Sequence, residues 1–147
     1  MDLSTIQARK TLVGKWAVKY GLDVAIVCAV CEQESGWNPW AMRYEPAFYD
    51  RYIAPMTGLT NTEMVARSTS YGLMQVMGQV AREFGYRNQF LSEMCDPDTG
   101  VAIGCQKLAK CFSTHPDPES ALLAYNGGGN PDYGRQVLAR VGNYSSP

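Results

Sequence analysis

One carboxylate in the sequence lies where an ionised group is costly. Glu34 closes an almost wholly apolar run and is followed at once by Ser35 and Gly36, in the stretch CEQESGWNP. Burial disfavours the charged form of a carboxyl group, and so does the negative end of a helix dipole, so both effects raise its pKa. A carboxylic acid that stays protonated near neutral pH can donate a proton to a leaving oxygen, as glycosidases require. The stretch therefore indicates an acid catalyst. The simpler interpretation is a surface residue on the last turn of a helix, paired with an arginine.

Cysteine and histidine residues give no comparable indication of a metal site. The chain has 5 cysteines, an odd number that cannot pair completely, which fits a reducing compartment. Cys28 and Cys31 form a C-x-x-C pair, but they lie inside the apolar run, no second pair follows, and His115 is the only histidine. A zinc site would lack ligands. We therefore expect buried free thiols, no metal and no cofactor.

The overall composition is that of one globular domain. A length of 147 residues suits a single core, and 46% apolar with 18% charged residues is typical of neither disordered nor fibrous chains. The net charge of -1 offers no basic patch for nucleic acid, so a large ligand would be held by shape, stacking and hydrogen bonds. No apolar stretch is long enough to cross a bilayer, so we expect no membrane partner. We also expect the protein to be a monomer.

Capping residues and apolar spacing predict a mostly α-helical fold. An amphipathic helix is expected over residues 4–20. Asp23 can cap a second helix, which is apolar on nearly every face and must stop near Gly36, so we expect it at the centre of the domain. Later helices are expected in SYGLMQVMGQVAREFGY, DPDTGVAIGCQKLAKCF, DPESALLAYN and PDYGRQVLARVGNY. No segment shows the alternation of a strand, so the class is mostly α, or α+β with at most a small β-hairpin.

The segment of residues 37–70 departs from this helical pattern. Three prolines interrupt it and aromatic residues are frequent. This composition predicts an irregular or short-helical excursion, with one possible turn of helix in NTEMVAR. A small β-hairpin, if the chain has one, is expected in the same segment.

Four stretches stand in a specific order along the chain: CEQESGWNPWA, STSYGLMQVMG, DPDTGVAIGCQKLAK and SALLAYNGGG. Each alone is a weak signal, but together they resemble the soluble lytic transglycosylase domain family, which is similar in fold to goose-type lysozymes. The resemblance covers residues 10–144 approximately. It implies a single lysozyme-like helical domain over residues 1–147, built around a central buried helix, with the glycan strands of peptidoglycan as its partner.

The resemblance assigns roles to several residues. It makes Glu34 the general acid and base, with Ser35 beside it. Residues 72–75 match the family's turn that lines the sugar cleft, where Gln75 would offer an amide that donates and accepts, and Met74 an adaptable apolar wall. The simpler alternatives are loop hydrogen bonding for Gln75 and core packing for Met74.

A Tyr-Asn pair completes the residues implied by the match. Tyr125 and Asn126 correspond to the family's pair near the catalytic carboxyl group, and their hydroxyl and amide would orient Glu34 or the substrate. Ordinary loop hydrogen bonding is the alternative for Asn126.

The chain departs from the family at about residues 41–69, where an insertion replaces a short link. The insertion could act as a lid whose aromatic rings stack on sugars, or as a small subdomain in which the rings pack together. Because of the insertion, the family's cleft serine matches either Ser68 or Ser70. We favour Ser70, beside Tyr71, and expect both of these neighbours to bind substrate.

The resemblance also implies a reaction that needs one carboxyl group. Glu34 would protonate the glycosidic oxygen of the β-1,4 bond between N-acetylmuramic acid and N-acetylglucosamine. As a carboxylate it would then take the proton of the C6 hydroxyl, giving a 1,6-anhydromuramoyl end. A hydrolytic muramidase needs a second carboxylate, and Glu45 comes first among the acids of the insertion, ahead of Asp50 and Glu63. A further alternative is a non-catalytic wall-binding module of a virion.

The N-terminal residues lack the basic-then-apolar order of a signal peptide. We therefore expect a protein made in the cytoplasm that acts on the cell wall after release through membrane pores, as an endolysin does, or as part of a virion or secretion machine. A chain trimmed of its leader is the alternative.

Overall fold

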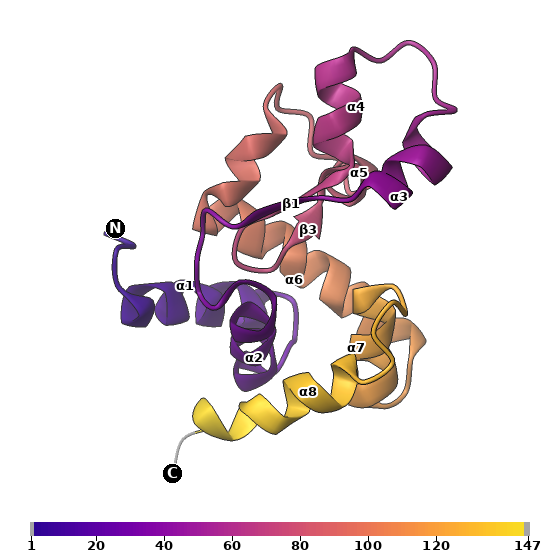
Figure 1. The fold of residues 1–147 in the computed structure, drawn as a ribbon. Helices are drawn as coiled ribbons and strands as arrows, with labels where there is room; N and C mark the ends of the chain where they lie inside the picture. The colour runs from indigo at the N-terminus through magenta and orange to yellow at the C-terminus, as the bar shows by residue number, and fades with distance from the viewer. Residues whose placement is uncertain (1, 146–147) are drawn as a thin grey trace.

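The computed structural model describes residues 2–145, which form a helical body and a smaller lobe (Figure 1). The helices are α1 (Ile6–Lys19), α2 (Val24–Ser35), α3 (Pro46–Phe48), α4 (Asn61–Arg67), α5 (Gly78–Glu83), α6 (Pro97–Thr114), α7 (Pro118–Asn126) and α8 (Tyr133–Arg140). The strands are β1 (Met42–Tyr44), β2 (Thr69–Tyr71) and β3 (Val76–Met77), and short π or 3-10 turns occupy Tyr49–Ile53, Leu91–Cys95 and Val141–Asn143. The mostly α-helical class predicted from the sequence is confirmed. None of the helices within residues 2–145 is long and apolar enough to cross a membrane.

Helix α2 is the buried central helix that the sequence predicts. Asp23 Oδ1 accepts the N–H of Ala25 at 2.8 Å, and Gly36 ends the helix in the left-handed conformation with a φ of 57°. Between these caps the side chains are mostly buried, because α1 packs on one side of α2 and α8 on another (Figure 1). Polar side chains begin only in the last turn, so this turn is where α2 can contribute chemistry.

The cysteines contribute to the core as free thiols, as predicted. Four of the five are buried and Cys111 is half-buried. Burial raises the pKa of Cys28 to about 11 and that of Cys105 to about 12. These thiols therefore stay protonated at neutral pH and pack as small apolar groups.

A three-stranded antiparallel sheet of order β1-β2-β3 joins the body to the lobe. Ser70 in β2 pairs with Arg43 in β1 and with Met77 in β3, so these three residues form one row across the sheet. The sheet has three strands, one more than the β-hairpin expected from the sequence. Its strands are two or three residues long, too short for alternation to be visible in the sequence.

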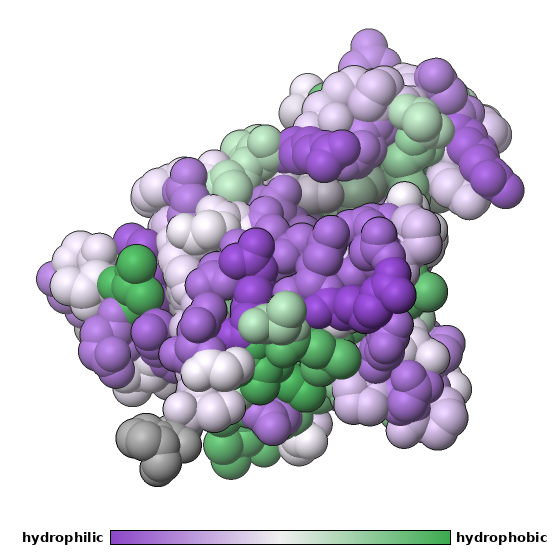
Figure 2. All heavy atoms as spheres, turned by 60° about the horizontal axis from the view of Figure 1, so that its bottom comes forward, coloured by the Kyte–Doolittle hydropathy of each residue, from purple (hydrophilic) through white to green (hydrophobic). Residues whose placement is uncertain are grey.

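Residues 41–69, which we call the insertion lobe, stand apart from the helical body, and a space-filling view shows an indentation between the two (Figure 2). The NTEMVAR segment is helix α4, as predicted, capped by Thr60. The Phe48 and Tyr52 rings pack with centroids 4.9 Å apart, and the Tyr44 and Tyr49 rings with centroids 6.3 Å apart. This packing agrees with the subdomain alternative, although Tyr44 and Tyr52 remain partly exposed.

One half-buried carboxylate fixes the insertion lobe to α5. Glu63 of α4 accepts hydrogen bonds from Arg67 at 2.9 Å and from Arg82 of α5 at 2.7 Å. The Arg82 guanidinium also donates to the carbonyl oxygens of Tyr86 and Asn88. The two arginines lower the pKa of Glu63, with Arg82 contributing most. Glu63 is therefore a structural anion, which removes it as a second catalytic acid.

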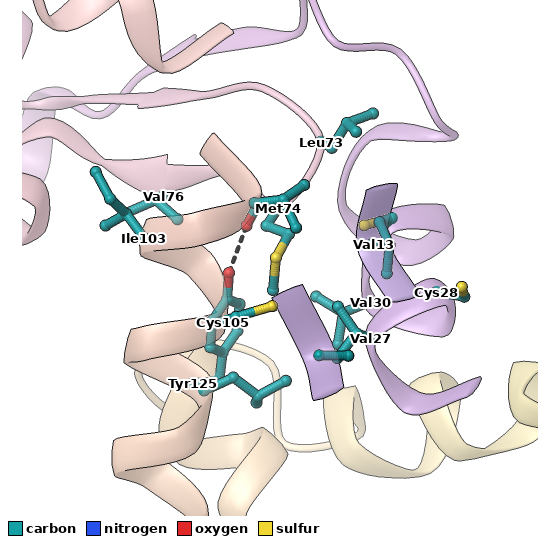
Figure 3. Close-up of a cluster of buried hydrophobic side chains, with 14 of the residues drawn as sticks. Val13, Val27, Cys28, Val30, Leu73, Met74, Val76, Ile103, Cys105 and Tyr125 are labelled. Atoms are coloured by element: carbon teal, nitrogen blue, oxygen red, sulfur yellow. Dashed lines mark hydrogen bonds between the residues drawn. The ribbon is translucent and has the colours of Figure 1, made fainter. Parts of the chain in front are cut away.

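Met74 belongs to the core of the body. Its side chain is fully buried and points between α2 and α6, toward Val30 and Cys105 (Figure 3). Gly104 of α6 provides the space for it, since a Cβ atom there would lie 2.9 Å from Met74 Cβ and closer still to Met74 Sδ. The turn that carries Met74 is thereby held against α6.

Gly104→Ala should therefore destabilise the fold. Alanine favours a helix over glycine by about 1 kcal/mol, but overpacking of a filled core costs about 1–3 kcal/mol, so we expect a net loss in the free energy of unfolding in urea. Gly142→Ala is the control, because nothing lies within 4 Å of a Cβ atom placed there. Equal stability of the two variants would contradict this account of the core.

Candidate active site

Glu34 occupies the last turn of α2, and α8 supplies its hydrogen-bond partner. The Tyr133 hydroxyl donates to Glu34 Oε1 at 2.8 Å. Burial raises the pKa of Glu34, while the Tyr133 hydrogen bond and the nearby charges of Lys107 and Arg43 lower it, and burial has the largest effect. Glu34 is thus a carboxyl group inclined to hold its proton, as predicted, and not a surface carboxylate paired with an arginine.

Ser35 joins the end of α2 to the turn of residues 72–75. Its hydroxyl oxygen lies 2.9 Å from both the Cys31 carbonyl oxygen and the Leu73 carbonyl oxygen. A hydroxyl group has one proton, so it donates to one of the two at a time. The residue next to Glu34 therefore contacts the backbone of the turn and links it to the last turn of α2.

Gln75 keeps only half of its amide for a ligand. Its Nε2 donates to the carbonyl oxygens of Ala41 and Gly72, both at 2.9 Å, and its backbone has a φ of 50°. Gly72, with a φ of 74°, donates its N–H to the same Ala41 carbonyl. Within residues 2–145 no group donates to the Gln75 Oε1 atom. The expected two-way amide is therefore an acceptor, because its donor side builds the turn.

Met74 and Tyr71, both expected to bind substrate, are buried. Met74 is fully buried, so its assignment as an apolar cleft wall is wrong and the core-packing alternative is correct. Tyr71 is 3% exposed and its hydroxyl donates to the Ala66 carbonyl, so its assignment is wrong too. A sequence motif does not state which side of a turn faces solvent, and here the apolar neighbours Leu73 and Val76 belong to the core as well.

The Tyr125 hydroxyl does not contact Glu34. It donates to the Met74 carbonyl oxygen at 2.6 Å, in a buried hydrogen bond (Figure 3). Tyr125 therefore holds the turn of residues 72–75 in place. The hydroxyl group that orients Glu34, which we expected from Tyr125, comes from Tyr133. Tyr125 is 2% exposed, so it is not placed to bind substrate as expected, although Glu34 is among the charges that raise its pKa.

Asn126, the last residue of α7, uses its side chain partly in the following loop. Its Oδ1 accepts the N–H of Asn130 at 2.9 Å, while the described residues give its Nδ2 no hydrogen-bond partner. Loop hydrogen bonding therefore accounts for the carbonyl half of this amide, and the NH2 half is left for a ligand.

The sheet presents a mixed polar row beside Glu34. Ser70 is buried, with its Oγ 3.2 Å from Met77 Sδ, and Arg43 is its neighbour on β1. Ser68 is fully buried and donates to the Met64 carbonyl, so of the two candidate serines Ser70 belongs to the row. The Arg43 charge lowers the pKa of Glu34, so the β1 end of this row lies within electrostatic range of the carboxyl group.

Four residues of the site were not predicted from the sequence: Tyr133, Lys107, Arg43 and Met77. A signal existed for Tyr133, which lies on the apolar face of α8, because a buried tyrosine hydroxyl needs a hydrogen-bond partner. The other three gave none, because the charges of Lys107 and Arg43 act on Glu34 only through the arrangement of α6 and β1 in the folded chain.

The remaining acid of interest is Glu45, at the start of α3. Its carboxylate forms an ion pair with Arg43, in which Arg43 Nε lies 2.9 Å from Glu45 Oε1. Arg43 is also one of the two cations whose charge lowers the pKa of Glu34. Glu45 therefore stays the candidate for the second acid of the hydrolytic alternative. No group of three or more His, Cys, Asp or Glu residues that could hold a metal ion occurs within residues 2–145.

Comparisons with known proteins agree with the geometry. The family model described as "Transglycosylase SLT domain" matches residues 11–140. A transglycosylase of Enterobacteria phage PRD1 is 28% identical over 122 residues, which is 80% of this chain and 34% of that protein. Membrane-bound lytic murein transglycosylase C of Shigella sonnei is 28% identical over 124 residues, 75% of this chain and 28% of that protein. The chain thus spans about a third of these relatives or less.

A solved structure shows the same fold. The lytic transglycosylase Slt of Pseudomonas aeruginosa, crystallised as an inactive mutant, matches with a TM-score of 0.58 and 21% identity. The match covers 89% of this chain and 18% of that one. The fold of nearly the whole chain therefore occurs as one part of a larger protein.

The raised pKa of Glu34 makes a prediction about stability. The folded protein holds the proton of Glu34 more tightly than the unfolded chain does, so stability is lost as pH rises from the ordinary value of 4.5 through the folded-state pKa. Glutamine keeps an acceptor for the Tyr133 hydroxyl and has no charge to desolvate. Glu34→Gln should therefore be more stable than the wild type at neutral pH, and the difference should vanish in acid, as measured by urea unfolding from about pH 4 to about pH 8.

Glu32→Gln, two residues away, is the matched control with the opposite sign. Hydrogen bonds from Arg140 and then Tyr144 lower the pKa of Glu32. The stability that this residue adds is present at neutral pH and lost as pH falls, so its glutamine variant should be less stable at neutral pH. If both variants lost stability equally at neutral pH, the environment described for Glu34 would be wrong.

Proposed function

The chain belongs to the transglycosylase SLT domain family, and on this premise we propose that it is a lytic transglycosylase that cleaves the β-1,4 bond between N-acetylmuramic acid and N-acetylglucosamine in peptidoglycan. Glu34 is the single acid and base. One observation carries the proposal: Glu34 is a carboxyl group with a raised pKa, and Tyr133 is its hydrogen-bond donor. No carboxylate within residues 2–145 is hydrogen-bonded to Glu34 or contributes to its pKa.

The first step uses the protonated form of Glu34. Its O–H group protonates the glycosidic oxygen, the bond from that oxygen to C1 of the muramic acid breaks, and positive charge develops on the sugar ring. Burial favours this protonated form, because it makes the carboxylate poorly solvated.

The second step uses the carboxylate that remains. Glu34 takes the proton of the C6 hydroxyl, the C6 oxygen bonds to C1, and the 1,6-anhydro ring closes without water. Glu34 ends the cycle protonated, as it began. The Tyr133 hydroxyl donates to the carboxylate in the interval between the two steps, when a hydrogen bond to the charged form is most favourable.

The walls of the site offer complementary groups to a glycan. Gln75 provides a carbonyl acceptor and Asn126 an amide donor, both at the ends of backbone turns that other residues hold in place. Sugar hydroxyl and N-acetyl groups need both kinds of partner. A chain of net charge -1 does not hold a large ligand mainly by charge, so these hydrogen bonds matter more.

A hydrolytic muramidase is the second candidate, because Glu45 is paired with Arg43 near the same site. Its carboxylate would direct a water molecule to C1 in place of the C6 hydroxyl. The two reactions differ in product, since hydrolysis leaves a reducing end on the muramic acid.

Mass spectrometry of muropeptides from digested cell walls tests the function. The wild type should release 1,6-anhydro ends, and Glu34→Gln should lower the rate at least about 100-fold, because it removes the proton that both steps transfer. Glu83→Gln, an exposed carboxylate on α5, is the activity control. Reducing ends in the wild-type digest would replace the transglycosylase with the hydrolase, and unchanged wall cleavage by Glu34→Gln would remove Glu34 from catalysis.

A further inference from the structure

Lys107 is a charged residue within a packed part of the molecule that the two proton transfers do not use directly. It lies on α6, one turn after Gly104, on the side of the helix that packs against α7. Burial lowers the pKa of its ammonium group. A lysine in such a place is costly unless its charge has partners.

Both close partners of the Lys107 ammonium belong to Tyr125. The Nζ atom donates to the Tyr125 carbonyl oxygen at 2.7 Å and lies 4.1 Å from the centre of the Tyr125 ring. The first contact is a charge-assisted hydrogen bond and the second a cation–π interaction. Two contacts of different kinds therefore fix one lysine to one tyrosine.

The carbonyl group that Lys107 binds is at the end of α7, where carbonyl oxygens lack helical partners. The N–H groups of Gly127 and Gly128 donate to Ala124 and Leu123, and no backbone N–H within residues 2–145 donates to the Tyr125 oxygen. Lys107 thus caps the C-terminal end of α7 from the neighbouring helix, where the helix dipole also favours a cation.

The same tyrosine connects the cap to the active site. Its hydroxyl donates to the Met74 carbonyl, one residue before Gln75, and the next residue along α7 is Asn126. Through Tyr125, Lys107 therefore helps to fix the positions of Gln75 and Asn126, the two residues proposed to offer polar groups to a glycan.

Lys107 also acts on Glu34 through its charge. The pKa of Glu34 responds to groups from three elements: the Tyr133 hydroxyl of α8, which is hydrogen-bonded to it, and the charges of Lys107 on α6 and Arg43 on β1. Lys107 lowers the pKa of Glu34, and Glu34 in turn raises that of Lys107. The other titratable groups affected by these charges are Tyr125, Cys31 and Cys111.

We propose that Lys107 is a positioning residue for the reaction of Glu34: its ammonium group holds the end of α7 in place and stabilises the Glu34 carboxylate between the two proton transfers. The catalytic part of this inference rests on the proposed function. The electrostatic part does not, because it concerns the ionisation of Glu34 in the free protein.

The first test measures that ionisation without turnover. The carboxyl carbons of ¹³C-labelled glutamate are titrated by NMR, and the Glu34 signal is identified by its absence from Glu34→Gln. Lys107→Gln keeps an N–H donor for the Tyr125 carbonyl but loses the charge, so the titration of Glu34 should move to higher pH. Lys107→Met should move it in the same direction, and Lys107→Arg, which keeps the charge, should leave it close to the wild type.

Lys110→Gln is the matched control. It makes the same chemical change one turn further along α6, where the lysine is exposed and its nearest ring is that of Phe84 at 5.8 Å. It should leave the titration of Glu34 unchanged. An unchanged titration in folded Lys107→Gln and Lys107→Met would overturn the electrostatic part of the proposal, and an equal shift in Lys110→Gln would make the effect one of general surface charge.

The second test measures turnover on cell walls as a function of pH. Removal of the Lys107 charge should lower kcat about 10- to 100-fold, as for other groups that hold a reacting centre in place, with a smaller change in KM. The alkaline limb of the kcat profile should move to higher pH in Lys107→Gln, and Lys107→Arg should restore most of the rate. A purely structural lysine would give a variant with lowered thermal stability and rate but an unmoved limb, and that result would overturn the proposal. A wild type that releases no anhydro ends would reject the proposed function, while the NMR titration would still decide the electrostatic part.

Discussion

A carboxyl group at the end of a buried apolar helix must be neutral, hydrogen-bonded or paired, because its charge is poorly solvated there. This constraint organises the structure around Glu34. Helix α2 has to be central for its last turn to be buried, and α1 and α8 bury it. Helix α8 then supplies the Tyr133 hydroxyl, and α6 and β1 bring the cations Lys107 and Arg43 within range. Segments far apart in the sequence thus converge on one functional group.

The groups that act on Glu34 shift its pKa in opposite directions, and this opposition suits its proposed role of giving a proton and taking it back. Burial favours the acid, whereas the Tyr133 hydrogen bond and the two cations favour the carboxylate. A general acid and base works best when its pKa lies near the working pH. Burial alone would make Glu34 a poor base, and hydrogen bonds and cations alone would make it a poor acid.

Features fixed by local chemistry could be predicted from the sequence, and features fixed by packing could not. Asp23 and Gly36 cap α2 through contacts with their own neighbours, so the limits of this helix were predictable. Glu34 stood out because a charge in an apolar run is conspicuous. The side of a turn that faces the core depends on what lies opposite, which for Met74 is Gly104, so the sequence could not decide between a cleft wall and core packing for this residue. Likewise, the Tyr133 hydroxyl is 99 residues from Glu34 along the chain, and only the packing of α8 on α2 joins them.

The core and the candidate active site share residues, so the stability of the fold and the geometry of the site are not independent here. The Met74 side chain fills the space above Gly104, and its carbonyl oxygen accepts the Tyr125 hydroxyl. Ser35 holds the preceding carbonyl of the same turn, and Gln75 follows directly. A change in packing beneath Met74 therefore moves the backbone on which the cleft acceptor stands. Cores of native density transmit such shifts rather than absorb them, so the position of the Gln75 acceptor depends on the packing of the buried residues that precede it in the turn.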